Sequence, residues 1–370
     1  MVLMEDLLSL LVQKGGSDLH ITGGAPPKVR IDGRLVDTEH EELTPEATKK
    51  LVYSVLGADQ IAKFEKNLEL DFSFGVAGLG RFRTNAFMQR GVVAAVLRVI
   101  PFEVFDFETL GLPRATCEWI CNLPRGLVLC TGSTGSGKST SLAALVDHIN
   151  ETRQGHIITI EDPIEFLHRN KNCLVNQREV GGDTRNFGNA LKSVLRQDPD
   201  VVLVGEMRDL ETIEAALTLA ETGHLTFATL HTSDVQQTVN RIIDVFPAHQ
   251  QQQIRTMLSF TLQAVLCQQL VPRSNGRGRA LAAEIMIANA AVRSLIRENK
   301  AHQIQSIIQT GGAAGMRTMN QSLFDLYRAG VVSYEDAVDH TSDVGEFQRL
   351  MERAAVGDGA GGASARRLKR

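Results

Sequence analysis

The stretch GLVLCTGSTGSGKST, which runs from Gly126 to Thr140, decides the fold of this chain. Its first five residues have the continuous apolar pattern of a strand buried on both faces of a parallel sheet. The remainder matches the motif G-x-x-x-x-G-K-[ST], and a helical pattern follows over Ser139 to Ile149. Strand, glycine-rich loop and helix in this order predict a loop whose backbone N–H groups hold nucleotide phosphates.

Two residues of this loop have separate expected roles. Lys138 should bridge the β- and γ-phosphates, and the Ser139 hydroxyl should bind Mg²⁺. We prefer ATP over GTP because the guanine-reading signature Asn-Lys-x-Asp is missing; its nearest candidate, 170–173, lacks the Asp. The alternative of a chance glycine-rich turn is disfavoured by the flanking strand and helix. The expected nucleotide-binding residues are Gly132, Ser133, Thr134, Gly135, Ser136, Gly137, Lys138, Ser139 and Thr140.

The same rhythm of strand, loop and helix continues after the loop. Apolar strand patterns recur at His156–Ile160, Val201–Val204 and Leu225–Leu230, with helical segments between them. Such alternation predicts an α/β domain with a parallel sheet. From about Gln250 onward the pattern is mostly helical, with one hairpin around Ser274-Asn275-Gly276.

Residues 1–100 have a different pattern, which predicts a small α+β domain. A helix is expected over Glu5–Val12, and another begins at Thr44, with Thr44 as cap and Pro45 in the first turn. The expected strands are Ser17–Ile21, Lys28–Ile31 before a hairpin at Asp32-Gly33, Leu70–Phe74, Arg81–Phe87 and Val92–Ile100. We expect a linker over 101–114, the nucleotide-binding domain with a helical C-terminal extension over 115–354, and a disordered tail over 355–370.

The composition narrows the class of protein. The 370 residues are 43% hydrophobic and 22% charged, which is ordinary for a globular protein and excludes wholesale disorder. A net charge of -4 argues against a main role in gripping nucleic acid. The five cysteines form no C-x-x-C pair, which argues against a zinc ribbon or redox motif, and we expect Cys117 and Cys121 to be small semi-buried residues. Their odd number fits a reducing cytoplasm. The N-terminus lacks a basic start, and no apolar run approaches the ~18 residues that span a bilayer, so we expect a soluble protein.

Acidic residues and a histidine follow three of the predicted strands. Glu161, Asp162 and Glu165 follow the first, and Glu206 follows the second after one glycine. Ligands bind at the carboxyl ends of strands in an open parallel sheet, where carboxylates can orient water or hold Mg²⁺. The alternative is that each acid caps a helix or turn. We expect Glu206 to reach the metal through water.

His231 follows the last of these strands. At that place it can sense the γ-phosphate or contact the attacking water. Taken alone, a structural histidine that makes ordinary hydrogen bonds is the more frequent alternative.

Together these motifs resemble the secretion-superfamily hexameric ATPases, in which they are called the Walker A, Asp-box, Walker B and His-box elements. The matching segments are Gly132–Thr140, Thr159–Glu165, Gly205–Asp209 and Thr229–Thr232. Within the superfamily the chain is most similar to the type IV pilus retraction (twitching motility) ATPases. That likeness rests on Gly16–His20, Cys173–Val180 and Ala291–Glu298, and it covers Leu7 to about His340.

The resemblance implies a fold and several residue roles. The fold is a RecA-like P-loop ATPase domain, preceded by a small α+β, PAS-like domain and followed by a helical part. Glu165 matches the proposed general base, in preference to Glu161 or Asp162. Arg83 and Arg98 match arginines that reach the nucleotide across the domain cleft, whereas the alternative for each is a solvated strand face. Arg81 and Arg114 are weaker candidates of the same kind.

The resemblance also implies a function and its alternatives. The implied protein is a cytoplasmic homohexamer at the inner face of the inner membrane, which hydrolyses ATP with Mg²⁺ to power pilus retraction. It would act on an inner-membrane platform protein, beside other pilus motor ATPases, and would meet the membrane only through partners, without nucleic acid. A pilus assembly or type II secretion ATPase is one alternative, although the long N-terminal region and four-cysteine site of those relatives are missing. An accessory ring subunit with little hydrolysis and a nucleic-acid motor are the others.

Overall fold

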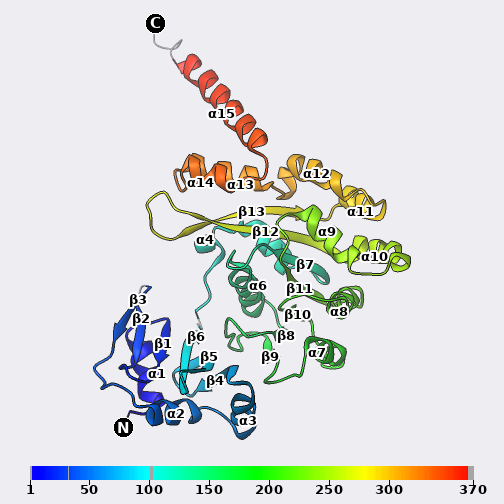
Figure 1. Ribbon diagram of the computed structural model, residues 1–370. Helices are drawn as coiled ribbons and strands as arrows, with labels where there is room; N and C mark the ends of the chain where they lie inside the picture. The colour runs from blue at the N-terminus through cyan, green and yellow to red at the C-terminus, as the bar shows by residue number, and fades with distance from the viewer. Residues whose placement is uncertain (1, 32, 101–102, 366–370) are drawn as a thin grey trace. The chain divides into compact units, whose positions relative to one another are not determined.

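Two compact units make up the computed structural model, which describes residues 2–31, 33–100 and 103–365 (Figure 1). The first unit contains residues up to Glu103 together with 162–169 and 178–186. The second contains 104–161, 170–177 and the chain from Phe187 onward. The segments 162–169 and 178–186 therefore belong to the first unit although the chain on either side of each belongs to the second, which the sequence did not indicate.

The first unit consists of one antiparallel sheet and the helices that pack with it. Its described residues give a six-stranded sheet in the order β3-β2-β1-β6-β5-β4. The strands are β1 Asp18–Ile21, β2 Lys28–Ile31, β3 Arg34–Asp37, β4 Glu69–Val76, β5 Gly80–Gln89 and β6 Val92–Ile100. The helices are α1 Met4–Gln13, α2 Pro45–Tyr53 and α3 Ala58–Asn67. The predicted small α+β domain is confirmed, although α3 was not predicted.

Local signals explain these elements. The Thr44 hydroxyl accepts a hydrogen bond from Ala47 N at 3.2 Å, as expected for the cap of α2. On β5 buried and exposed side chains alternate, which places Phe82 in the core. The apolar face of α1, with Leu7 and Leu11 fully buried, packs into the same core. The predicted turn residue Asp32 lies outside the described residues.

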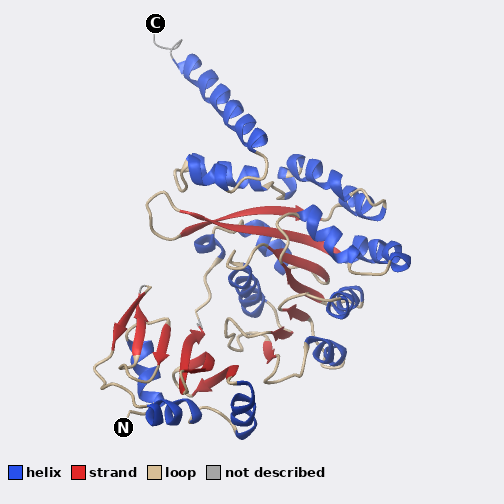
Figure 2. Ribbon diagram, in the orientation of Figure 1, coloured by secondary structure: helices blue, strands red, loops and turns tan. Residues whose placement is uncertain are grey.

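A seven-stranded sheet forms the centre of the second unit's described residues, in the order β13-β12-β7-β11-β10-β8-β9 (Figure 2). The strands from β12 to β8 in this order are parallel, and β13 pairs antiparallel with β12. Their bounds are β7 Gly126–Thr131, β8 His156–Glu161, β9 Leu174–Glu179, β10 Val201–Val204, β11 Leu225–Leu230, β12 Leu262–Pro272 and β13 Arg279–Ile287. Every residue of β7, β10 and β11 is buried, which confirms the interpretation of their apolar runs.

Helices cover this sheet and continue beyond it. They are α4 Phe107–Leu110, α5 Arg114–Cys121, α6 Lys138–Thr152, α7 Phe187–Val194, α8 Leu210–Glu221, α9 Val235–Asp244 and α10 Ala248–Thr261. After the β12–β13 hairpin follow α11 Ala290–Arg297, α12 Ile304–Thr310, α13 Met319–Arg328, α14 Tyr334–Asp339 and α15 Val344–Ala365. The hairpin predicted near Asn275 is confirmed, but its arms are long strands of the main sheet. The predicted tail overlaps the end of α15, and residues 366–370 lie outside the described residues.

Two further sequence features can be compared with the structure. All five cysteines are buried and free, so Cys117 and Cys121 are more deeply buried than expected. In the described part of the chain, no helix combines the length and the apolar character that crossing a membrane requires.

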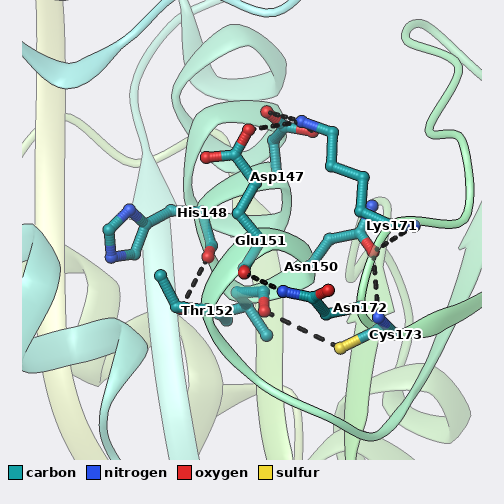
Figure 3. Close-up of polar contacts among 9 residues, drawn as sticks. Asp147, His148, Asn150, Glu151, Thr152, Lys171, Asn172 and Cys173 are labelled. Carbon is teal, nitrogen blue, oxygen red and sulfur yellow. Dashed lines mark hydrogen bonds and ion pairs between the residues drawn. The ribbon is translucent and has the colours of Figure 1, made fainter.

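The far end of α6 is tied to the segment that leads into β9 (Figure 3). The Lys171 ammonium donates to Asp147 at 2.9 Å and to Glu151 at 2.6 Å, one helical turn apart. Asn150, which is fully buried, accepts hydrogen bonds at its Oδ1 from the backbone N–H groups of Lys171 and Cys173. Because α6 begins at the glycine-rich loop, these contacts fix the helix that carries Lys138 at its other end.

Replacing Asn150 tests how much this attachment contributes. Asn150→Ala leaves the part-buried N–H of Lys171 and the buried N–H of Cys173 without their acceptor, so we expect the free energy of unfolding to fall by about 1–3 kcal/mol. Asn122→Ala is the matched control, because it removes one exposed hydrogen bond to the Glu118 carbonyl. Urea titration followed by circular dichroism measures both. Equal losses in the two variants would contradict the assignment.

Candidate nucleotide-binding site

The glycine-rich loop has a backbone that only glycine permits at its first position. Gly132 has φ 143°, and a Cβ there would lie 2.4 Å from the Gln268 carbonyl oxygen and 2.5 Å from Ser136 Oγ. Gly137, with φ 90°, directly precedes α6, and no side chain caps that helix. The first N–H groups of α6 therefore stay available for an anion, where the helix dipole also favours negative charge.

Two side chains of the loop fit a phosphate ligand. Lys138 Nζ donates to the Gly132 carbonyl at 2.8 Å and to the Ser133 carbonyl at 2.9 Å, so its ammonium is held over the loop. Ser136 Oγ is buried and has no hydrogen-bond partner among the described residues. An unsatisfied buried hydroxyl is costly, and a phosphate oxygen in the loop would satisfy it. Ser139 and Thr140, at the start of α6, are half-buried.

Gln268, which the sequence did not indicate, supports the glycine-rich loop. Gln268 of β12 is buried, its backbone carbonyl lies against Gly132, and its Nε2 donates to Ser141 Oγ of α6 at 2.8 Å. It thus contacts both the loop and the helix that follows. Only the assignment of β12 as the strand beside β7 would have found it, and that pairing joins residues far apart in the sequence.

The sheet order brings the other sequence-predicted groups of this unit to one edge. Strands β7, β11, β10 and β8 are parallel neighbours, so their carboxyl ends, and the residues that follow them, lie on the same side. The loop, His231 and Glu206 follow β7, β11 and β10, and Glu161 is the last residue of β8. A site at this edge agrees with the general rule for open α/β sheets.

Glu206 and His231 are in direct contact. Glu206 Oε1 lies 3.1 Å from His231 Nε2, and Arg208 binds both Glu206 oxygens at 2.8 Å. The hydrogen bond from Arg208 is the main cause that lowers the pKa of Glu206, against the opposite effect of its partial burial. The carboxylate is therefore ionised at neutral pH. The sequence named Glu206 and His231 separately, and it did not indicate that Arg208 would pair with the acid.

The backbone around Glu206 is fixed by the neighbouring strand. Thr229 Oγ1 donates to the Gly205 carbonyl at 2.5 Å, and Met207 N donates to the Thr229 carbonyl at 3.0 Å. These bonds hold the two residues that flank Glu206 in the chain. The acid is therefore presented from a rigid turn.

The acids at the end of β8 and after it differ in their surroundings. Glu161 accepts hydrogen bonds from Thr159 Oγ1 at 2.6 Å and from Gln177 Nε2 at 3.3 Å, within the second unit. Glu165 is exposed and belongs to the segment 162–169 of the first unit. The structure therefore assigns Glu161 to a local hydrogen-bond group and leaves the Glu165 carboxylate exposed.

Arg83 and Arg98 form a pair on the first unit. They lie directly opposite each other on β5 and β6, and both side chains are exposed. Like charges in register destabilise a sheet, so this face is suited to an anion. Arg98 Nε donates to Asp18 Oδ1 at 2.8 Å, whereas among the described residues Arg83 has no ion-pair partner. Burial opposes ionisation of Asp18, but hydrogen bonds from Ser17 and Arg98 outweigh it and lower the pKa of Asp18.

The weaker arginine candidates are engaged elsewhere. Arg114 pairs with Glu108 and Glu118 at 2.7 Å each on the surface of the second unit. Arg81 is half-buried and contacts Ser73 and Glu179 in the first unit. Both guanidinium groups therefore already have carboxylate partners.

Several known proteins are similar to this chain over most of its length. The model of the family "Type II/IV secretion system protein" matches residues 2–339. The type IV pilus retractation ATPase PilT of Pseudomonas aeruginosa is 50% identical over 332 residues, covering 90% of this chain and 96% of that protein. A twitching motility protein of Neisseria gonorrhoeae is 52% identical over 311 residues, covering 84% of this chain and 83% of the relative.

A solved structure extends the likeness to three dimensions. The crystal structure of the pilus retraction motor PilT with bound ADP matches with a TM-score of 0.88 at 50% identity, covering 94% of this chain and all of that one. The predicted fold class and the resemblance to pilus retraction ATPases are confirmed. This chain therefore belongs to the type II/IV secretion system protein family.

Proposed function

We propose that this chain is an ATP-hydrolysing motor that powers retraction of type IV pili. The observation that carries the proposal is the glycine-rich loop, with Lys138 held over it, at the same sheet edge as the Glu206–His231 pair. This arrangement places an acid and a histidine at the same sheet edge as a phosphate cradle, and positioning and charge stabilisation of the phosphates are what ATP hydrolysis needs. The names of the relatives, a retraction ATPase and a twitching motility protein, support the same activity.

ATP with Mg²⁺ is the proposed substrate. The backbone from Gly132 to Gly137 would surround the phosphates, Lys138 would bridge the β- and γ-phosphates, and Thr140 would complete the start of α6. The Ser139 hydroxyl and, through water, the Glu206 carboxylate are oxygen donors of the kind that Mg²⁺ prefers. When bound, the ion neutralises charge on the transferred phosphoryl group.

Glu165 is the proposed general base. Its carboxylate would take a proton from water as the water oxygen attacks the γ-phosphorus and the bond to the β–γ bridging oxygen breaks, giving ADP and phosphate. His231, which contacts Glu206, would detect whether a γ-phosphate is bound. Arg83 and Arg98 would stabilise the negative charge of the transferred group, which the like-charge pairing of their side chains supports.

The proposed catalytic and binding residues are divided between the two units, and the movement of the motor would follow from this division. We assign residues 1–100 to an N-terminal domain, 101–114 to a linker, 115–354 to the ATPase domain and 355–370 to a tail; within 115–354, the segments 162–169 and 178–186 belong to the same compact unit as the N-terminal domain. Nucleotide binding would close the N-terminal domain over the loop, and phosphate release would reopen it. We further propose a cytoplasmic homohexamer at the inner face of the inner membrane, acting on a platform protein beside other pilus motors.

Replacing the proposed base tests the chemistry. Glu165→Gln is expected to lower magnesium-dependent phosphate release by about 10²–10⁴-fold, because the amide cannot accept the proton. The affinity for a fluorescent ATP analogue should change little. Glu161→Gln is the control, and we expect it to keep most of the turnover because this acid is engaged with Thr159 and Gln177. Full turnover in Glu165→Gln, or its loss in the control alone, would overturn the assignment.

Deleting the gene tests the direction of the motor. A retraction motor leaves cells with more surface pili than the parent strain, whereas an assembly motor leaves cells without pili. Electron microscopy of sheared pili and intact cells measures the difference. We expect more pili together with loss of twitching, and bald cells would support the assembly alternative.

A further inference from the structure

Glu179 is a buried carboxylate in the first unit, and it has no assigned role in the proposed reaction. It is the last residue of β9 and only 5% exposed. An ionised carboxylate with so little access to water is stable only when hydrogen bonds and positive charge compensate it. Its partners therefore indicate what it holds in place.

The partners come from three separate segments of the chain. The Ser73 hydroxyl of β4 donates to Glu179 Oε1. Arg81 of β5 lies 3.4 Å from Oε2 and also donates to Ser73 Oγ at 2.6 Å. The backbone N–H of Ile164 donates to Glu179 Oε2 at 3.1 Å. One carboxylate thus joins two strands of the N-terminal sheet to the segment 162–169, all within the first unit.

The backbone of Glu179 is itself held in a tight turn. Glu179 N donates to Asp183 Oδ2 at 2.8 Å, and the Glu179 carbonyl accepts from Asp183 N at 2.8 Å and from Thr184 N at 3.2 Å. The carboxylate therefore has little freedom to follow a displaced partner. A change at either end of the contact is transmitted to the other.

Ile164 is the residue directly before the proposed base. Its side chain is buried and its N–H is held by Glu179, whereas the next side chain, Glu165, is exposed. Arg81 lies two residues before Arg83 on β5, on the same face of the strand. The contacts of Glu179 therefore connect the backbone that carries the base to the strand that carries an arginine proposed to reach the nucleotide.

From this connection we propose that Glu179 is a positioning residue, which fixes Glu165 to the N-terminal sheet so that the base and Arg83 move together. The inference rests on the proposed function, because it assumes that Glu165 is the base. It also gives Arg81, a weaker candidate for nucleotide contact, a different role in holding Glu179. A loss of this contact affects the placement of the base and leaves the phosphate loop of the second unit unchanged.

Two variants test the proposal by steady-state kinetics of the full chain. Glu179→Gln removes the charge, and Ser73→Ala removes one donor while leaving the carboxylate. We expect kcat to fall by up to about 100-fold in Glu179→Gln, because a small misplacement of a reacting group is costly. Ser73→Ala should show a smaller fall. KM for ATP and the affinity for ADP should stay unchanged in both.

A matched control lies on the same pair of strands. Asp71 of β4 accepts a hydrogen bond from Asn85 of β5 at 3.1 Å. Asp71→Asn should leave kcat unchanged. An equal fall of kcat in this control, or a joint loss of kcat, ADP affinity and thermal stability in both test variants, would mean a general structural role and would overturn the proposal.

The double variant Glu165→Gln/Glu179→Gln separates this inference from the proposed function. If Glu179 acts through Glu165, the second change adds no further loss of kcat to the first. If Glu165→Gln alone keeps full turnover, the proposed function fails. If Glu165→Gln is inactive while Glu179→Gln and Ser73→Ala keep the wild-type kcat, only the positioning role fails. Additive losses in the double variant contradict it as well.

Discussion

The candidate site depends on one constraint, which is the backbone of the loop between β7 and α6. At Gly132 the chain turns so close to the Gln268 carbonyl that no side chain fits, and at Gly137 it enters the helix with its first N–H groups uncapped. This geometry is possible because β7 is buried in the middle of a parallel sheet and because α6 is fastened at its far end through Asn150. The fixed loop in turn determines where Lys138 lies, and the order of the parallel strands determines which residues join it.

Local patterns predicted most of the fold because each element carries its own signal. The apolar runs of β7, β10 and β11, the cap at Thr44 and the hairpin near Asn275 are all short-range features. Tertiary pairing was harder to predict. The long strands β12 and β13 were expected only as a hairpin, because nothing local says that β12 pairs with β7. Helix α3 was also not predicted, because its residues carry no strong signal for the start or the end of a helix.

The same distinction between local patterns and tertiary contacts applies to the residues of the candidate site. The loop residues and Glu206 stand in motifs, so the sequence could name them. Gln268 and Glu179 act through contacts with segments distant in the sequence. Arg208 lies inside the Gly205–Asp209 motif, but the motif did not indicate that its side chain pairs with Glu206. The arginines show the difference in another way. The sequence analysis proposed the same kind of role for Arg81 as for Arg83, although as a weaker candidate. In the structure the Arg81 side chain is engaged with Glu179, whereas the Arg83 side chain is exposed opposite Arg98.

We propose that hydrolysis by this chain drives the withdrawal of pili. Time-lapse imaging of labelled pili tests this directly in cells that lack the gene and carry either the wild-type chain or Glu165→Gln. We expect frequent retraction events with the wild-type chain and almost none with the variant, at equal expression and with pili still extended. Retraction at the wild-type rate and speed in cells with Glu165→Gln would contradict the claim.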